Sequence, residues 1–159
     1  MGLDMYLYRE EYISDCEYSN DNLQRVDEFV ITVTRTFENA TEDTRTVVVR
    51  KPTQGLWLKT PVMYWRKANA IHKWFVDYSG REDDCTDIYL SGSRLIELRD
   101  LCQQVLADHK KAPELLPTQE GFFFGPTEYD GYYFEDLAKT VEALKNIKEE
   151  DEFIYRASW

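Results

Sequence analysis

The sequence contains little of what metal centres, disulfide frameworks and membrane spans are built from. Its 159 residues include three cysteines and two histidines. The cysteines are widely spaced and form no Cys-x-x-Cys pair, which favours reduced thiols over disulfides or a zinc knuckle. Two histidines are too few for a histidine-rich metal site. No apolar run approaches the about 20 residues that a transmembrane helix needs, so no membrane association is expected.

Familiar catalytic motifs are also missing. The sequence has no P-loop, no glycine-rich dinucleotide fingerprint, no His-Glu-x-x-His and no Gly-x-Ser-x-Gly. One acidic cluster, Glu82, Asp83, Asp84 and Asp87, lacks the ligand spacing of a calcium loop and is more typical of a solvated loop. We therefore assign no catalytic residue, and we expect neither a cofactor nor a metal.

What is present describes an acidic globular protein. Hydrophobic residues make up 43% of the chain and aromatic residues 14%, which favours one folded domain spanning residues 1–159 over disorder. The formal net charge of −11 argues against direct binding to nucleic acid or to anionic membranes. The same charge would suit a protein that docks on a basic surface.

The basic residues are unevenly distributed. Between Thr44 and Val76 the chain holds seven lysines and arginines and no acidic residue. One interpretation places these charges on solvated faces, where they pair with acidic neighbours. The other is a local positive patch for an anionic ligand. The seven residues are Arg45, Arg50, Lys51, Lys59, Arg66, Lys67 and Lys73.

Hydrophobic periodicity predicts an α+β fold, a mostly antiparallel sheet with about three packed helices. Alternating apolar residues and β-branched runs predict strands, and stripes at 3.6-residue spacing predict helices. We expect the acidic residues 9–27 to be irregular and residues 38–43 and 52–55 to form turns. The expected strands are 3–8, 29–37, 44–51, 87–90, 121–125 and 153–159. The expected helices are 60–78, a second that starts after Ser91 or Ser93 and ends near His109, and 134–148.

The helix expected over residues 60–78 is the centre of this interpretation. Thr60 would cap it, and Pro61 suits its first position. A helical projection gives a core stripe and, beside it, an edge with aromatic, amide and imidazole groups. The core stripe is Tyr64, Ala68, Ile71, Phe75 and Tyr78. The edge is Trp65, Asn69, His72 and Val76, with Arg66 and Lys73 beyond it.

That edge is the first candidate site. His72 could act as a general base or a hydrogen-bond donor, while Arg66, Lys67 and Lys73 would attract an anion. The structural alternative is that His72 and Asn69 satisfy buried polar groups and that Trp65 only packs.

The second candidate is the segment 121–133. Its glycines allow close approach to a ligand, and three consecutive phenylalanines must point to both sides of a strand. A buried strand explains this pattern as well as a binding surface does. Tyr129, Tyr132 and Tyr133 suit an interface because each combines an apolar ring with a polar tip.

Together these segments predict a set of ligand-binding residues. We expect His72 and Asn69 to line a cavity shared with the strand 121–125. Trp65 or the phenylalanines would stack on the ligand. The full predicted set is Trp65, Arg66, Asn69, His72, Lys73, Phe122, Phe124, Tyr129 and Tyr133.

Three stretches resemble a family of small phage and prophage proteins of uncharacterised function. They are the opening Met-Gly-Leu-Asp-Met-Tyr-Leu, the run from Tyr64 to Phe75 and the segment from Leu115 to Tyr133. The resemblance implies no activity and carries over no catalytic residue. It implies a protein of the host cell cytoplasm, made during infection or carried by a prophage.

Charge, motifs and resemblance favour a phage-type accessory protein that acts by binding. It would inhibit or sequester a host component, such as one of host defence, or an anionic small molecule such as a nucleotide. One alternative is an enzyme acting on a nucleotide or another phosphorylated substrate, with His72 in acid–base catalysis and Arg66 as a clamp. The other alternative is a structural or homo-oligomer-forming phage protein.

Overall fold

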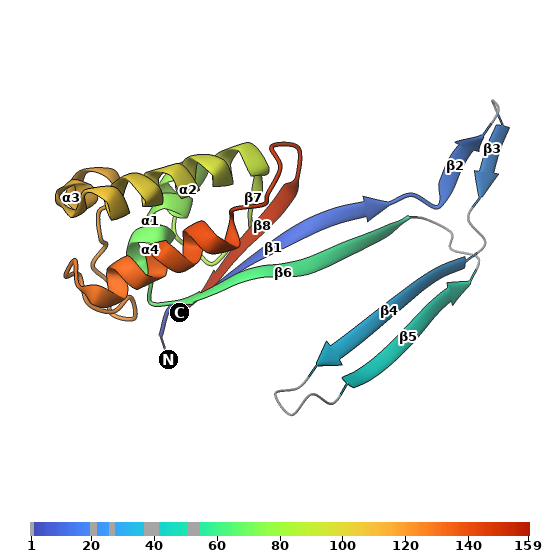
Figure 1. Ribbon diagram of the computed structural model, residues 1–159, viewed down its shortest axis with the longest axis horizontal. Helices are drawn as coiled ribbons and strands as arrows, with labels where there is room; N and C mark the ends of the chain where they lie inside the picture. Colours follow the sequence, from blue (N-terminus) through green and yellow to red (C-terminus); the bar gives the residue numbers. More distant parts are fainter. Residues whose placement is uncertain (1, 20–21, 26–27, 37–41, 51–54) are drawn as a thin grey trace. The chain divides into compact units, whose positions relative to one another are not determined.

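The computed structural model describes residues 2–19, 22–25, 28–36, 42–50 and 55–159 (Figure 1). The chain divides into two compact units. The main unit comprises Met1–Glu11 and Lys59–Trp159, and the hairpin unit comprises Tyr12–Leu58. The expectation of a single domain over residues 1–159 stays a prediction.

A four-stranded sheet underlies the main unit. Its strand order is β6-β1-β8-β7, and β8 pairs antiparallel with both β1 and β7. The first and last strands of the chain are therefore neighbours, with Leu7 opposite Tyr155. The bounds are β1 Asp4–Ile13, β6 Leu56–Arg66, β7 Ile88–Ser91 and β8 Glu152–Ser158. The predicted antiparallel α+β fold is confirmed.

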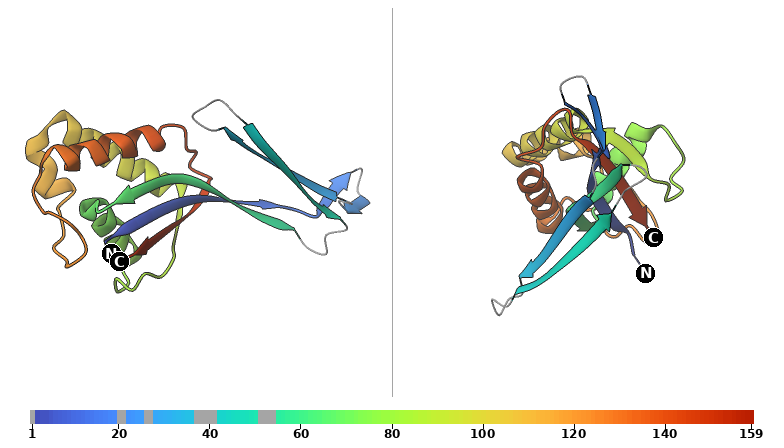
Figure 2. Two further views of the ribbon diagram at one scale, coloured as in Figure 1. Left: turned by 90° about the horizontal axis from the view of Figure 1, so that it is seen from below. Right: turned by 90° about the vertical axis from the view of Figure 1, so that its right-hand side faces the viewer.

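Helices pack on this sheet, and α2 and α4 lie side by side (Figures 1 and 2). Leu3, just before β1, and Met5 and Leu7 within it are fully buried in the hydrophobic core. The elements are α1 Asn69–Ser79, α2 Gly92–Ala107, the 3₁₀-helix η1 His109–Lys111, α3 Ala112–Leu115 and α4 Gly131–Ala143. Within the described residues, no helix is long and apolar enough to cross a membrane.

Aromatic contacts hold α1 to the sheet. The Phe75 ring stacks on Tyr155 of β8 with 3.8 Å between ring centroids, and Trp65 of β6 meets Phe75 edge-on at 6.1 Å. The indole Nε1–H of Trp65 donates to Thr140 Oγ1 of α4 over 2.8 Å. All four side chains are buried, so this cluster joins strands β6 and β8 to α1 and α4.

The helix predicted over residues 60–78 is wrong in its first half. Residues up to Arg66 extend strand β6, and α1 begins only at Asn69. Thr60 and Pro61 therefore lie within a strand and do not start a helix. Tyr64, expected in the core, is 49% exposed and donates its hydroxyl to Asp4 of β1. Strand pairing overrode the helical pattern because side chains alternate sides along a strand, which exposes Tyr64 and buries Trp65.

Other boundaries also moved. The described part of the segment 9–27 is not irregular, because β1 continues to Ile13 and β2 Cys16–Ser19 pairs antiparallel with β3 Asn22–Arg25. The helix predicted over 134–148 starts earlier and ends earlier, as α4. The expected strand 121–125 is a turn, in which Phe124 N–H donates to the Gly121 carbonyl over 3.1 Å. The strands expected at 3–8 and 153–159 are confirmed.

In the hairpin unit, β4 Glu28–Thr36 pairs antiparallel with β5 Glu42–Arg50, as predicted from the two β-branched runs. Tyr12 and Trp57, near the ends of this unit, are in ring contact at 5.0 Å. The turn predicted over 38–43 and the one over 52–55 lie mainly outside the described residues.

We expect Phe75→Ala to lower the free energy of unfolding by about 3–5 kcal/mol, because it removes a fully buried ring and leaves a cavity against Tyr155. Urea titration followed by tryptophan fluorescence measures this. Tyr78→Ala on the same helix is the matched control, since Tyr78 is 39% exposed, and this variant should lose about 1 kcal/mol or less. Equal losses in the two variants would contradict this account of the core.

Candidate functional site

A cleft of about 360 Å³ opens in the main unit between the start of α1 and the first turns of α4. We call it the α1–α4 cleft. Three segments meet there, which are the β6–α1 connection, the loop that precedes α4, and α4 itself. Its polar and charged lining residues are Arg66, Lys67, Asn69, Thr118, Glu128, Asp130, Tyr132, Tyr133, Glu135, Asp136 and Lys139.

The β6–α1 connection provides the basic side of the cleft. Lys67 has the left-handed φ of 60°, unusual for a residue with a side chain. Its aliphatic stem lies so close to Gly125 that an added Cβ there would come within 3.0 Å of Lys67 Cβ. The Lys67 N–H donates to the Leu3 carbonyl over 2.8 Å. Backbone pairing and packing therefore hold this unusual conformation in place.

The sharp turn leaves the beginning of α1 without a side-chain cap. Asn69 N–H donates to the Lys67 carbonyl, and His72 N–H donates to the Ala68 carbonyl. Between them, the N–H groups of Ala70 and Ile71 have no hydrogen-bond acceptor in the described part of the chain, and both residues line the cleft. Such groups give a helix start a partial positive charge.

Side chains of α4 and its preceding loop provide the acidic side. Asp130 caps the helix by accepting from Tyr133 N–H over 3.0 Å. Lys139 pairs with Glu135 at 2.8 Å. Burial raises the pKa of Asp136 to about 6. Among described residues, no hydrogen bond or ion pair reaches the Asp136 carboxylate.

The cleft is therefore polarised. Arg66 and Lys67 lie on its β6–α1 side, and neither forms an ion pair with any described residue. Four acids and one lysine line the α4 side. A molecule that fills the cleft would meet positive charge at one end and negative charge at the other.

Asn69 braces the cleft wall. Its Nδ2 donates to the carbonyls of Phe124 and Pro126 over 3.1 and 2.8 Å, and its Oδ1 accepts from Gln119 N–H over 3.2 Å. The side-chain amide of Asn69 thus forms all of its hydrogen bonds with the loop that leads to α4. The amide fixes this loop against the start of α1, as the structural alternative for Asn69 expected.

His72 lies outside the cleft, in a polar network with Tyr155 and Asp83. Its Nδ1 lies 2.7 Å from the Tyr155 hydroxyl and its Nε2 lies 2.9 Å from Asp83 Oδ2. A neutral ring satisfies both contacts by donating from Nε2 and accepting from the tyrosine. Burial and the nearby Asp83 carboxylate raise the Tyr155 pKa well above its usual value. The hollow beside His72 measures only about 10 Å³, too little for a ligand.

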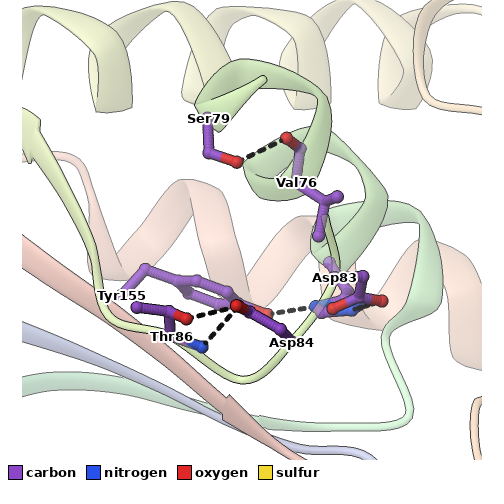
Figure 3. A network of polar contacts seen from close by, with 7 residues as sticks. Val76, Ser79, Asp83, Asp84, Thr86 and Tyr155 are labelled. Atoms are coloured by element: carbon purple, nitrogen blue, oxygen red, sulfur yellow. Dashed lines mark hydrogen bonds and ion pairs between the residues drawn. The ribbon is translucent and has the colours of Figure 1, made fainter. Parts of the chain in front are cut away.

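The network anchors the loop that follows α1. Ser79 Oγ donates to the Val76 carbonyl, and Thr86 N–H donates to Asp84 Oδ1 over 3.0 Å (Figure 3). Asp83 in the same loop reaches back to His72, which is only 1% exposed. These contacts join the end of α1 to strand β8, which is a positioning role.

The structure brings three of the nine predicted site residues together in the cleft, namely Arg66, Asn69 and Tyr133. The Tyr133 hydroxyl donates to the Leu116 carbonyl, and Tyr129 packs edge-on against Tyr133 behind the cleft wall. Trp65 is buried against Thr140. Lys73 does not line the cleft, and its Nζ forms an ion pair with Asp77 Oδ2 at 2.7 Å.

We expected His72 and Asn69 to line a cavity shared with residues 121–125, and this prediction is wrong. Phe124 is buried and lies 5.1 Å from the His72 ring, whereas Phe122 is 94% exposed. The described residues that line the cleft and the His72 hollow include none of 121–125. Phe124 does lie close to His72, as expected, but the two rings are in direct contact and leave no cavity between them.

The acidic wall of the cleft was not among the residues predicted from the sequence. Asp136 and Lys139 were not singled out among thirty acidic and nineteen basic residues. One signal was available, because Asp136 lies three residues after Tyr133 and four before Thr140. That spacing places a carboxylate beside the buried stripe of α4.

The chain matches no family model, no curated protein and no solved structure. Its site is therefore interpreted from geometry. The α1–α4 cleft combines ligand-sized volume with unpaired charged groups, and the His72 network has neither.

We expect Asp83→Ala to accelerate amide hydrogen exchange across residues 80–87 and to lower the free energy of unfolding by about 1–3 kcal/mol, because His72 Nε2 loses its partner. Exchange mass spectrometry and urea titration measure the two effects. The neighbouring exposed Glu82→Ala is the control and should leave both unchanged. Identical exchange in the two variants would contradict an anchoring role for Asp83.

We expect Asp136→Asn to stabilise the protein above pH 7 and to have no such effect below pH 4. The folded-state pKa of about 6 exceeds the value of 3.8 for an unperturbed aspartate, so the folded state binds more protons between pH 4 and 6. The stability of the wild type therefore falls as pH rises through this window. After allowance for solvent screening, the gain in Asp136→Asn is about 1 kcal/mol.

Urea titrations at pH 4, 5, 6 and 7.5 test this expectation. Glu128→Gln, on the exposed rim of the same cleft, should change stability by less than about 0.5 kcal/mol at every pH. A gain in Asp136→Asn that is the same at all four pH values would show that the charge of Asp136 is not its source.

Proposed function

We propose that the protein acts by binding, as a phage-type accessory protein that sequesters a small anionic molecule of nucleotide size in the α1–α4 cleft. The volume of about 360 Å³ lies within the range of small-molecule sites. The phage setting and the cytoplasm of the host cell rest on the sequence resemblance. Capture of a signalling nucleotide would be one way for such a protein to act against host defence.

One observation carries this proposal, the unpaired basic side of the cleft. Arg66 and Lys67 lie beside the uncapped start of α1, and no described acid neutralises them at ion-pair distance. Several lysines and arginines elsewhere in the main unit have such partners, as Lys73 and Arg94 do. An anionic group on a ligand would supply the missing charge and accept hydrogen bonds from the guanidinium.

An enzymatic role for His72 finds less support in the geometry. Both ring nitrogens are engaged by Tyr155 and Asp83, and the side chain lies outside the cleft that holds Arg66. The pair proposed for acid–base catalysis and substrate clamping therefore does not face one substrate. Binding without catalysis needs no such pair.

A host protein is the second candidate partner. The turn 122–124 presents Phe122, 94% exposed, while backbone hydrogen bonds from Leu3 to Phe123 and from Phe124 to Gly121 hold its backbone. A well-positioned exposed aromatic ring is typical of interface anchors. In this case Phe122→Ser would abolish partner binding and Arg66→Glu would not.

We expect wild-type protein purified from phage-infected cells to retain a small anionic molecule, visible by native mass spectrometry, and Arg66→Glu to lose it. Arg66 is exposed, so reversing its charge should change stability by no more than about 0.5 kcal/mol. Lys110→Glu, an equal charge change outside the cleft, is the matched control and should retain the ligand. Retention by Arg66→Glu at the wild-type level would refute the cleft as the binding site.

A further inference from the structure

Asp136 is a half-buried acid of the cleft whose carboxylate has no partner among the described residues. It lies on the flank of α4 that faces the core, between Tyr133 and Thr140. The nearby Thr140 hydroxyl donates to the Asp136 backbone carbonyl over 2.7 Å and accepts from Trp65. Lys139 is engaged by Glu135. Within the described chain, no hydrogen bond or ion pair reaches the Asp136 carboxylate.

An ionised carboxylate in this position is costly for the free protein. Burial penalises its charged form, as the pKa of about 6 indicates, yet at neutral pH the group is mainly charged. Two carboxylate oxygens together accept about four hydrogen bonds, and burial removes water from part of that capacity. A donor supplied by a ligand would remove this penalty.

The remaining charges of the cleft restrict what that ligand can be. Arg66 and Lys67 from the β6–α1 connection line the same cleft as Asp136, with Glu128 and Asp130 from the loop and Glu135 and Lys139 from α4 itself. With Asp136 itself, four acids and three bases line the cleft. A purely anionic molecule would be attracted at one end and repelled at the other, so the lining favours a ligand with groups of both kinds.

The geometry of a carboxylate further limits which chemical groups can act as the donor. The two oxygens accept two parallel N–H bonds from one planar group, which is the strongest arrangement available to them. Guanidinium groups and the Watson–Crick edge of guanine, with its adjacent N1–H and N2–H donors, have this shape. Adenine and hypoxanthine do not present two such adjacent donors.

We propose that the α1–α4 cleft selects a bipolar ligand, whose anionic group lies against Arg66 and Lys67 and whose planar pair of N–H donors binds the Asp136 carboxylate, as a guanine nucleotide would. This inference rests on the proposed function, because it assigns the second half of the same binding site. Asp136 would then be the specificity-determining residue of the cleft.

Calorimetric titrations of the wild type at pH 7.5 and low salt test the proposal with three phosphates. Guanosine 5′-monophosphate carries both donors, inosine 5′-monophosphate lacks only the amino group, and ribose 5-phosphate lacks the base. We expect the guanosine compound to bind at least tenfold more tightly than the inosine compound. Asp136→Asn and Asp136→Ala should remove this preference while leaving ribose 5-phosphate binding within about twofold of the wild type.

A pH series provides a readout that a merely structural role would not change. The ratio of guanosine monophosphate to ribose 5-phosphate affinity should fall as pH drops from 7 to 5, because Asp136 is protonated and loses acceptor capacity. The phosphate group titrates in both compounds, so its effect cancels in the ratio. In Asp136→Asn the ratio should not depend on pH.

The outcomes separate the two proposals. Equal affinities for the guanosine and inosine compounds, or a preference that survives in both Asp136 variants, would overturn the bipolar ligand and leave anion binding at Arg66 intact. If none of the three phosphates binds the wild type, this inference fails for guanine nucleotides. If in addition no anionic ligand is retained in native mass spectrometry, the proposed function fails as well. Circular dichroism of each variant confirms that it is folded.

Discussion

The contact between Tyr155 and Phe75 is the one on which the main unit depends most. Tyr155 belongs to β8, which pairs on one side with β1 and on the other with β7, so it joins three strands. Its ring stacks on α1, and its hydroxyl meets His72 on the same helix. A single buried residue thus fixes both the distance and the rotation of α1 relative to the sheet. The position of the cleft at the start of α1 follows from this.

The cleft shows how a fold with a strong acidic excess can contain a local basic site. The net charge of −11 predicts repulsion of anions at long range. At ordinary ionic strength such repulsion is screened over about 8–10 Å, whereas groups within a cleft act over shorter distances. Arg66, Lys67 and the start of α1 therefore dominate one end of the cleft. The left-handed backbone conformation of Lys67 turns the chain sharply from β6 into α1.

His72 illustrates that a residue type often associated with catalysis can serve position alone. Its imidazole joins Asp83, in the loop after α1, to Tyr155 in the last strand, with aromatic rings on its flanks. Asn69, three residues earlier, does the same for the loop before α4. Two polar residues of one helix face thus hold two loops, and one of these loops forms a wall of the cleft.

Local pattern was enough to predict much of the fold. The period of two in residues 3–8, the paired β-branched runs 29–37 and 44–51, and the apolar stripe of α2 each fit one kind of element, because backbone geometry alone sets these spacings. Residues 60–66 carry aromatic residues at positions that suit either a helix face or a strand, and only pairing with β1 decided between them.

The site depended still more on tertiary structure. Asn69 meets Phe124, 55 residues away in sequence, and Asp136 differs from twenty-nine other acids only because packing half-buries it beside a cleft. Burial and long-range contact come from the whole folded chain, and these are what make a common residue a candidate ligand-binding group.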